Sequence, residues 1–266
     1  MVAICTMICK PFHFETWLNY HFSIGVEYIF LRVENTPELE EIISKYSNVF
    51  AYYDSDVNTF NNYWTIQKRQ NHFFETIKQK MLDLNIEWVV SNIDSDELLC
   101  CENINEILKN VPKNYDVVQI SNYEAVYSND NVDNPFIETN TFIENNFLAY
   151  GNGKSASRLN EKTETHGPHS FKGSVFKLLP RKICVLHYES SNFERWYTKF
   201  KNYNQTDKEL IDKIPFPFYK ESIEIIREGN KEKARKYFNK KKVDISENTL
   251  KLYWTPTLQQ KNICWG

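Results

Sequence analysis

The sequence contains little glycine, no long hydrophobic segment and no excess of positive charge. Only 7 of its 266 residues are glycine, and the formal net charge at pH 7 is −3. Nucleic-acid-binding proteins usually carry a clustered basic surface, so this charge balance argues against that class of partner. The apolar run at residues 2–9 is too short to cross a bilayer and lacks a basic leader, which indicates neither a signal peptide nor a transmembrane segment. We therefore expect a cytoplasmic protein.

Cysteine is sparse as well. The six cysteines form no CxxC pair, and their density is far below that of a secreted disulfide scaffold. We expect reduced thiols that mostly lie in the core. Apolar side chains, in contrast, are plentiful, because 41% of the residues are hydrophobic and 15% are aromatic. That is enough to build the core of one sizeable domain.

Strand-like and helix-like segments alternate along the chain. Runs typical of strands lie at residues 2–9, 26–35, 48–53, 88–93, 115–127, 174–179 and 183–189. Helical patterns lie at residues 13–25, 36–46, 63–84 and 102–111, and again from residue 192 onward. This alternation predicts an α/β fold with a mostly parallel sheet flanked by helices on both faces. Ligands of such sheets bind at the carboxyl ends of the strands.

Residues 128–169 interrupt this pattern with a polar stretch that is rich in asparagine. Long loops inside a compact domain are more often functional than idle. We expect this segment to be irregular, to be mobile without ligand, and to close over a ligand bound beside it.

An acidic cluster follows the apolar run that begins at residue 88. Asp94 and Asp96 are two residues apart, so in a strand both carboxylates would face one side, where they suit Mg²⁺ or Mn²⁺. Another interpretation is equally open at this point. Asp94 and Glu97 have the spacing of a capping box, and they could simply start a helix at Leu98.

Four ordered blocks of residues help to decide between a metal site and a helix cap. They are Trp17, Leu18, His21 and Gly25; then Arg69 and Gln70; then Asp94, Asp96, Glu97 and Leu99; and finally His187, Tyr188, Ser191 and Lys199. In this order the blocks resemble those of the glycosyltransferase family 2-like and family 92 enzymes, over roughly residues 3–200. The chain departs from that pattern after the first strand, where Pro11 and Phe12 replace the family's usual Asn-Glu.

The resemblance implies a GT-A (Rossmann-like) fold and a glycosyltransferase. We expect a GT-A-type catalytic domain over residues 1–200 and a helical C-terminal extension over residues 201–266 packed on the same domain. The implied reaction moves a sugar from a nucleotide-sugar donor, in particular a UDP-sugar, to a hydroxyl of a glycan or protein-linked acceptor. The resemblance also implies Mn²⁺ or Mg²⁺ as cofactor, because a divalent ion stabilises the departing diphosphate.

The resemblance assigns roles to individual residues. Asp96 and His187 would bind the metal, and Asp94 would bind either the metal or the ribose hydroxyls. We expect the remaining donor contacts from charged and polar residues at strand ends and nearby helices, namely Glu34, Asn35, Arg69, Gln70, Lys154 and Lys199. A plain core histidine is the competing interpretation of His187.

Two further residues are candidates for catalysis. Glu124 follows the expected strand at residues 115–127 and is the best carboxylate for a general base that takes the proton of the acceptor hydroxyl. The resemblance would place His169, in a Gly-Pro turn, over the donor or the acceptor, and a plain loop histidine is the competing interpretation.

Two alternatives stay open. The chain could be a carbohydrate-binding or scaffold protein that keeps the fold and lacks turnover. The basic run at residues 231–242 could contact an anionic membrane, although a solvated helix face is the commoner outcome of such a run.

Overall fold

The computed structural model describes residues 1–54, 63–126, 132–139, 141–143, 148, 151–203 and 207–247. The main sheet has seven strands in the order β10-β6-β9-β4-β1-β2-β3. Their bounds are Val2–Ile8 (β1), Tyr28–Glu34 (β2), Val49–Asp54 (β3), Trp88–Ser91 (β4), Val117–Ile120 (β6), Lys154–Arg158 (β9) and Val175–Lys177 (β10). All neighbouring strands pair in parallel except at β9, which is antiparallel to both β4 and β6. The predicted α/β class with a mostly parallel sheet is confirmed, and this architecture is consistent with a GT-A-type fold.

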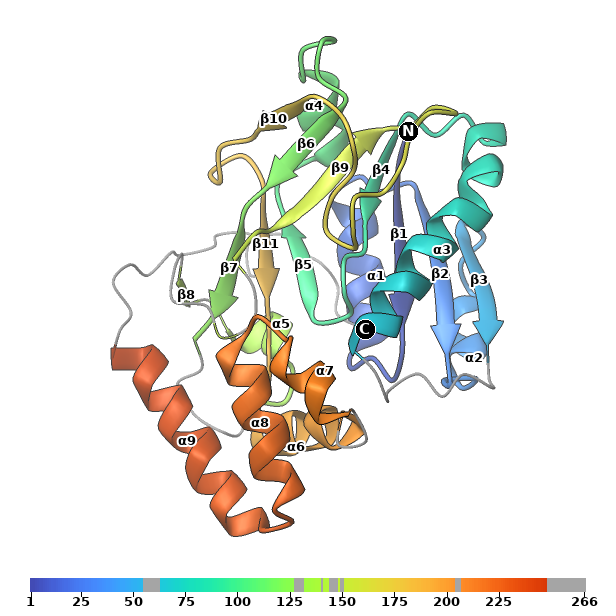
Figure 1. Ribbon diagram of the computed structural model, residues 1–266. Helices are drawn as coiled ribbons and strands as arrows, with labels where there is room; N and C mark the ends of the chain where they lie inside the picture. The colour runs from blue at the N-terminus through green and yellow to red at the C-terminus, as the bar shows by residue number, and fades with distance from the viewer. Residues whose placement is uncertain are drawn as a thin grey trace.

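Helices cover both faces of this sheet (Figure 1). Because side chains alternate along a strand, Val2 and Ile4 of β1 join the core on one face and Ala3 and Cys5 join the core on the other. The first core also contains apolar residues of α1 (Phe14–Ser23), α2 (Leu39–Ile43) and α4 (Ile104–Lys109), and the second contains those of α3 (Tyr63–Asp83). The helices therefore form where the sequence predicted them, with ends a few residues shorter.

A second, smaller sheet continues from the first. Its order is β5-β11-β7-β8, with bounds Glu97–Cys100 (β5), Cys184–His187 (β11), Asn122–Ala125 (β7) and Phe142–Ile143 (β8). The single strand expected at residues 115–127 is broken at Ser121, so that β6 belongs to the main sheet and β7 to the small one. The helix considered for the residues after Glu97 is also wrong, because this segment is the strand β5.

The C-terminal part of the described chain is helical. The helices are α6 (Phe193–Asn202), α7 (Lys208–Asp212), α8 (Pro217–Arg227) and α9 (Lys231–Glu247), and the short α5 (Pro135–Glu138) lies earlier in the chain. Large side chains of α6, including Trp196, pack with α8 and α9 in a separate core, and the Trp196 indole donates to the Ser222 hydroxyl over 3.0 Å. This helical core starts at Phe193, so it crosses the boundary expected at residue 200. Figure 1 shows it below the two sheets.

The expectation of an irregular segment at residues 128–169 is wrong in part. β9 belongs to the main sheet and separates β4 from β6. Gly153 precedes it with φ +68°, and a Cβ at this position would lie 2.0 Å from the Ile120 carbonyl oxygen, so the entry into β9 requires glycine. Other parts of the segment, residues 128–131, 140, 144–147 and 149–150, lie outside the described residues, and closure over a ligand stays a prediction.

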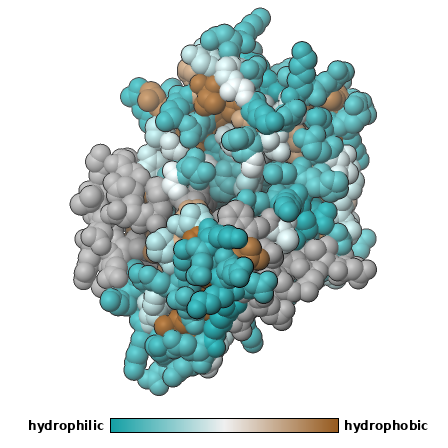
Figure 2. Space-filling view, in the orientation of Figure 1, coloured by the Kyte–Doolittle hydropathy of each residue, from teal (hydrophilic) through white to brown (hydrophobic). Residues whose placement is uncertain are grey.

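Within the described chain, none of the helices combines the length and the apolar character needed to cross a membrane. Figure 2 shows a largely hydrophilic face with small, separate hydrophobic patches. The basic run of α9 is partly neutralised, since Lys233, Lys236 and Lys241 form ion pairs with acidic side chains. These pairs favour the solvated-face interpretation of that run.

Candidate functional site

The acidic cluster lies in a turn between β4 and β5. Asp94 and Asp96 are therefore not in a strand, and the expectation that their side chains share one face is wrong. The Glu97 carboxylate accepts from the Asp94 N–H over 2.7 Å, and the Glu97 N–H donates to the Asp94 carbonyl over 3.0 Å. The first contact is one half of the capping box that the spacing predicted, whereas the second is a backbone turn bond. A strand follows them because residues 97–100 pair with residues 184–187 of β11.

On one side of this turn, the buried Lys154 side chain forms ion pairs with Asp94 and Glu97. Its ammonium lies 2.8 Å from Asp94 Oδ2 and 3.0 Å from Glu97 Oε2, and its side chain is 0% exposed. Burial opposes the charge on Lys154, but the two carboxylates outweigh it and hold the pKa of the ammonium above its usual value. Burial raises the pKa of Glu97 to about 8, against the attraction of Lys154. Lys154 and Asp94 therefore pair with each other, while Asp94 also lines the cleft described below; the phosphate contact expected of Lys154 and the metal contact expected of Asp94 stay predictions.

The other side of the turn holds three possible metal ligands. Asp96 Oδ2 and Glu189 Oε2 each lie 3.9 Å from His187 Nε2, and one ligand atom from each residue fits within 4.8 Å of the others. We call Asp96, His187 and Glu189 the triad. The ladder of the small sheet positions it, because His187 is opposite Glu97 and the Tyr188 N–H donates to the Asp96 carbonyl. Burial lowers the pKa of His187, although the two carboxylates beside it act in the opposite direction.

Lys199 of α6 lies beside the triad. Its ammonium is 2.5 Å from Glu189 Oε2 and 4.0 Å from Asp96 Oδ2. Burial opposes this charge, and the Glu189 carboxylate more than compensates, so the pKa of Lys199 lies well above its usual value. The Tyr219 hydroxyl donates to Glu189 over 3.1 Å. The structure thus brings together Asp96, His187 and Lys199, which the sequence predicted, and adds Glu189, which it missed.

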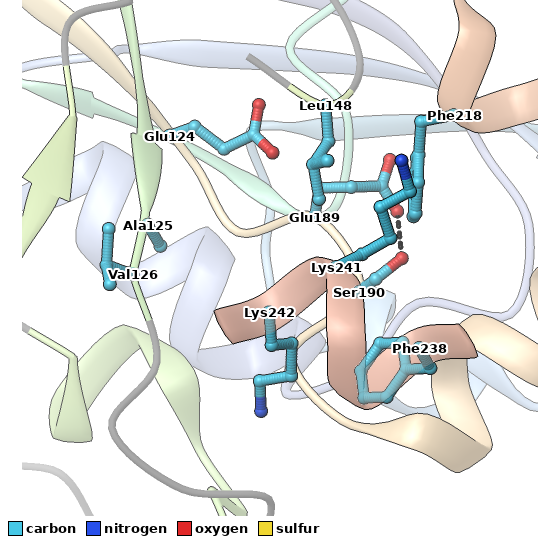
Figure 3. Close-up of a pocket in the computed structure, with 10 residues that line it drawn as sticks. All are labelled: Glu124, Ala125, Val126, Leu148, Glu189, Ser190, Phe218, Phe238, Lys241 and Lys242. Carbon is cyan, nitrogen blue, oxygen red and sulfur yellow. Dashed lines mark hydrogen bonds between the residues drawn. The ribbon is translucent and has the colours of Figure 1, made fainter. Parts of the chain in front are cut away.

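Glu124 lies behind His187 and does not reach the cleft that the triad faces. Its Oε2 is 4.0 Å from His187 Nδ1, on the ring edge away from the triad contacts, and its side chain is 2% exposed. Figure 3 shows the Glu124 carboxylate at a small cavity that Leu148, Phe218 and Glu189 also line, with the Ser190 hydroxyl bonded to Glu189. This position does not favour the general-base role, which stays a prediction; the carboxylate lies close enough to His187 Nδ1 to interact with the imidazole electrostatically.

The residues at the end of β2 that were expected to contact the donor form hydrogen bonds and ion pairs within the protein. Glu34 is buried and accepts from Arg69 Nε over 2.9 Å and from Arg32 Nε over 2.6 Å. Arg69 also donates to the Thr65 hydroxyl over 3.1 Å. Asn35 has φ +47°, and its N–H donates to the Asp54 carbonyl. The diphosphate contact predicted for Arg69 stays a prediction, although its Nε is bonded to a buried carboxylate.

A cleft of about 790 Å³ opens in front of the triad. Its walls come from the end of β1, the start of α3, the Asp94–Asp96 turn, residues 166–170, residues 187–190 and the helices α6 and α8, and include Gln70, His169 and Lys199. The strand order reverses between β1 and β4, and this is where parallel sheets bind their ligands.

His169 is fixed at the cleft wall by a hydrogen bond from Nδ1 to the Gly153 carbonyl, 3.1 Å away. Burial lowers the pKa of His169 well below its usual value, so this ring is neutral.

Comparisons with known proteins agree with a glycosyltransferase-type protein. No family model matches the sequence. Two proteins of Arabidopsis thaliana match at low identity: glycosyltransferase-like At2g41451 is 25% identical, covering 66% of this chain and 51% of the relative, and glycosyltransferase-like At3g57200 is 24% identical, covering 66% and 44%. The chain thus spans about half the length of the curated relatives it matches. These likenesses do not single out family 92.

Two solved structures are also similar to this chain. HddC from Yersinia pseudotuberculosis matches with 12% identity and a TM-score of 0.39, covering 75% of this chain and 98% of that chain. CMP:2-keto-3-deoxy-manno-octonic acid synthetase in complex with CTP matches with 12% identity and a TM-score of 0.29, covering 59% and 73%. At these TM-scores neither likeness carries a functional argument.

Proposed function

We propose that the chain is a metal-dependent glycosyltransferase that moves a sugar from a nucleotide-sugar, in particular a UDP-sugar, to a hydroxyl of a glycan or protein-linked acceptor. The observation that carries this proposal is the triad with the Lys199 ammonium beside it, on the wall of a cleft at the switch point of the sheet. The low-identity relatives named glycosyltransferase-like support the same class.

The chemistry of the triad fits a divalent ion. It offers one imidazole and two carboxylates, a donor set that suits Mn²⁺ and, less well, Mg²⁺. Burial favours the neutral form of His187, which is the form that ligates a metal. When bound, the ion would stabilise the negative charge that develops on the departing nucleoside diphosphate.

The chain's own cations would share that task. Lys199 holds its ammonium within 4.0 Å of the Asp96 carboxylate, where a diphosphate bound at the triad would meet it. Arg195 lies one helical turn earlier on α6 and also lines the cleft, with its guanidinium packed on the Phe12 ring. Fixed positive groups in a partly closed cleft stabilise developing negative charge without having to reorganise. Gln70 and His169, which also line the cleft, would contact the donor or the acceptor.

A thermal-shift screen of nucleotide-sugars, each with and without Mn²⁺, tests the proposal. A donor that binds the native protein raises its melting temperature, and we expect this rise only when Mn²⁺ is present. Donor hydrolysis should then follow in the same samples, because an intact transferase passes some sugar to water. Binding without hydrolysis would favour the carbohydrate-binding alternative. No response to any nucleotide-sugar, with Mn²⁺ binding intact, would contradict the proposed donor class.

A further inference from the structure

Two cysteines face each other across the small sheet. Cys100 at the end of β5 is directly opposite Cys184 at the start of β11 in the antiparallel register. Opposite residues of an antiparallel pair have Cα atoms about 4.5–5.5 Å apart, and disulfides span Cα distances of about 4.4–6.8 Å. The usual Cα spacing of such a pair therefore falls within the range that a disulfide spans, and small shifts of the two strand ends would bring the sulfur atoms together.

The two thiols already interact. Opposite residues of a ladder point to the same face, and the Cys100 and Cys184 thiols share a hydrogen bond. That hydrogen bond, together with burial, raises the pKa of the Cys184 thiol well above its usual value. Cys184 is 8% exposed, whereas Cys100 is more accessible, so an external reagent meets Cys100 first. The next residue, Cys101, is 4% exposed and lies outside the ladder.

We propose that Cys100 and Cys184 form an oxidation site at which a small-molecule disulfide such as oxidised glutathione installs a cross-strand disulfide. The Cys100 thiolate attacks the glutathione disulfide, forms a mixed disulfide and releases one glutathione. The Cys184 thiol then loses its proton as its sulfur attacks the Cys100 sulfur, and the second glutathione is released. The two thiol protons end on the two released glutathiones, so the protein loses two electrons and the reagent gains them.

A disulfide at this position would affect the cleft, because the same strand pair positions the triad. The same strand ladder carries Cys100 and Cys184 at one end, and His187 opposite Glu97 at the other. A covalent bond at the first end fixes the register that brings Asp96 beside His187. It also restricts the long chain segment between the two cysteines in the unfolded state, which stabilises the folded protein.

The test uses the full chain, reduced and then incubated with oxidised glutathione. Digestion under non-reducing, acidic conditions and tandem mass spectrometry should identify one peptide pair joined through Cys100 and Cys184. We expect the melting temperature of the oxidised protein to rise by about 4 °C or more, and to return when a reductant is added. Cys101→Ser is the matched control, because it changes a neighbouring thiol outside the ladder and should leave both results intact.

Cys100→Ser should abolish both the joined peptide and the rise in melting temperature. A link through Cys101, or glutathione bound to single cysteines without an internal link, would overturn the proposal. Fragment ions of the wild-type peptide distinguish Cys100 from Cys101 directly, so the assignment does not depend on the folding of either variant.

Discussion

Two lysines, each between two carboxylates, flank the Asp94–Asp96 turn, and they differ mainly in their access to water. Lys154 is 0% exposed and bonded to Asp94 and Glu97. Lys199 is 30% exposed, pairs with Glu189 and faces the cleft together with the rest of the triad. The first group fixes the shape of the turn, and the second presents charge to a ligand. Composition alone does not separate a structural ion-pair cluster from a ligand site, whereas the exposure of the lysine distinguishes them here.

The difference also explains why two aspartates that are two residues apart have different partners. The turn directs Asp94 toward the buried Lys154 and Asp96 toward His187. A buried ion pair is costly to break, because the remaining charge loses both its partner and its water. A charge that faces the cleft can be replaced at a smaller cost. Four measurements test whether the buried groups and the cleft-facing groups differ in this way.

We expect the largest effect from Lys154→Met. At about pH 9, above the raised pKa of Glu97, it removes the cation that pairs with this buried carboxylate and should lower the free energy of unfolding by about 3–5 kcal/mol in urea denaturation. Lys199→Met is the matched control. It should cost less, about 1–2 kcal/mol, because its position reaches water and Glu189 keeps the Tyr219 hydroxyl as a donor. Equal losses for the two variants would show that the buried and cleft-facing sides do not differ.

The buried histidines extend the comparison to acid stability. His21 donates from Nδ1 to the Trp17 carbonyl and accepts from the Leu99 N–H at Nε2, so both ring nitrogens are used in its neutral form. Burial lowers the pKa of His21 to about 3 from its usual 6.5. As the pH falls from 6.5 toward 3, the unfolded chain binds a proton that the folded chain excludes, so the stabilisation present above pH 6.5 is lost.

At about pH 4.5 this group should account for a loss of roughly 2–3 kcal/mol relative to neutral pH. His21→Gln keeps one donor and one acceptor but does not titrate, so its urea stability should fall less between pH 7 and about pH 4.5. Parallel pH profiles for the wild type and the variant would exclude His21 as a source of acid sensitivity.

Removing a proposed metal ligand should have the next largest effect. Asp96→Asn should weaken Mn²⁺ binding by more than tenfold, which is about 1.4 kcal/mol or more, because one of the two carboxylate ligands is lost. Asp94→Asn changes the same chemical group in the same turn but on the Lys154 side, and should change Mn²⁺ affinity less than about threefold. Isothermal titration measures both. Similar losses would restore the original expectation that both aspartates bind the ion.

The smallest effect is expected from Glu124→Gln. If this carboxylate orients His187 through Nδ1, Mn²⁺ affinity should fall by about tenfold or less, with a matching loss of turnover. A general base would behave differently, because its loss would lower kcat while Mn²⁺ affinity stayed unchanged. Comparing the Kd for Mn²⁺ with kcat in one variant therefore decides between the two roles.

The sequence predicted the strands well wherever an apolar run determines them by itself. The runs at residues 2–9 and 26–35 became β1 and β2. The sequence-based prediction failed where the secondary structure of a segment depends on pairing with a strand far away in the sequence. The hydrogen bonds between Asp94 and Glu97 suit either a helix start or a turn before a strand, and pairing with β11, far along the chain, selects the strand.

The site was predicted in part for the same reason. The resemblance to known transferases pointed to Asp96, His187 and Lys199, which the fold places together. Glu189 was missed although its signal was present, since residues two apart at a strand end face the same side. Arg69 was expected to contact a phosphate because it matches the Arg-Gln pair of known transferases, and Lys154 because it lies in the polar segment near His169. Their buried partners, Glu34 and Glu97, become visible only in three dimensions.

β9 has a consequence for the order in which the protein can fold. β4 and β6 pair with β9 and not with each other, so the main sheet is divided until residues 154–158 have been synthesised. A chain released from the ribosome before that point would expose two unprotected strand edges, which are templates for aggregation. The late insertion also requires contacts between residues far apart in sequence, which slows folding. Truncations that end before β9 should therefore yield insoluble protein, whatever their intrinsic helix and strand propensities.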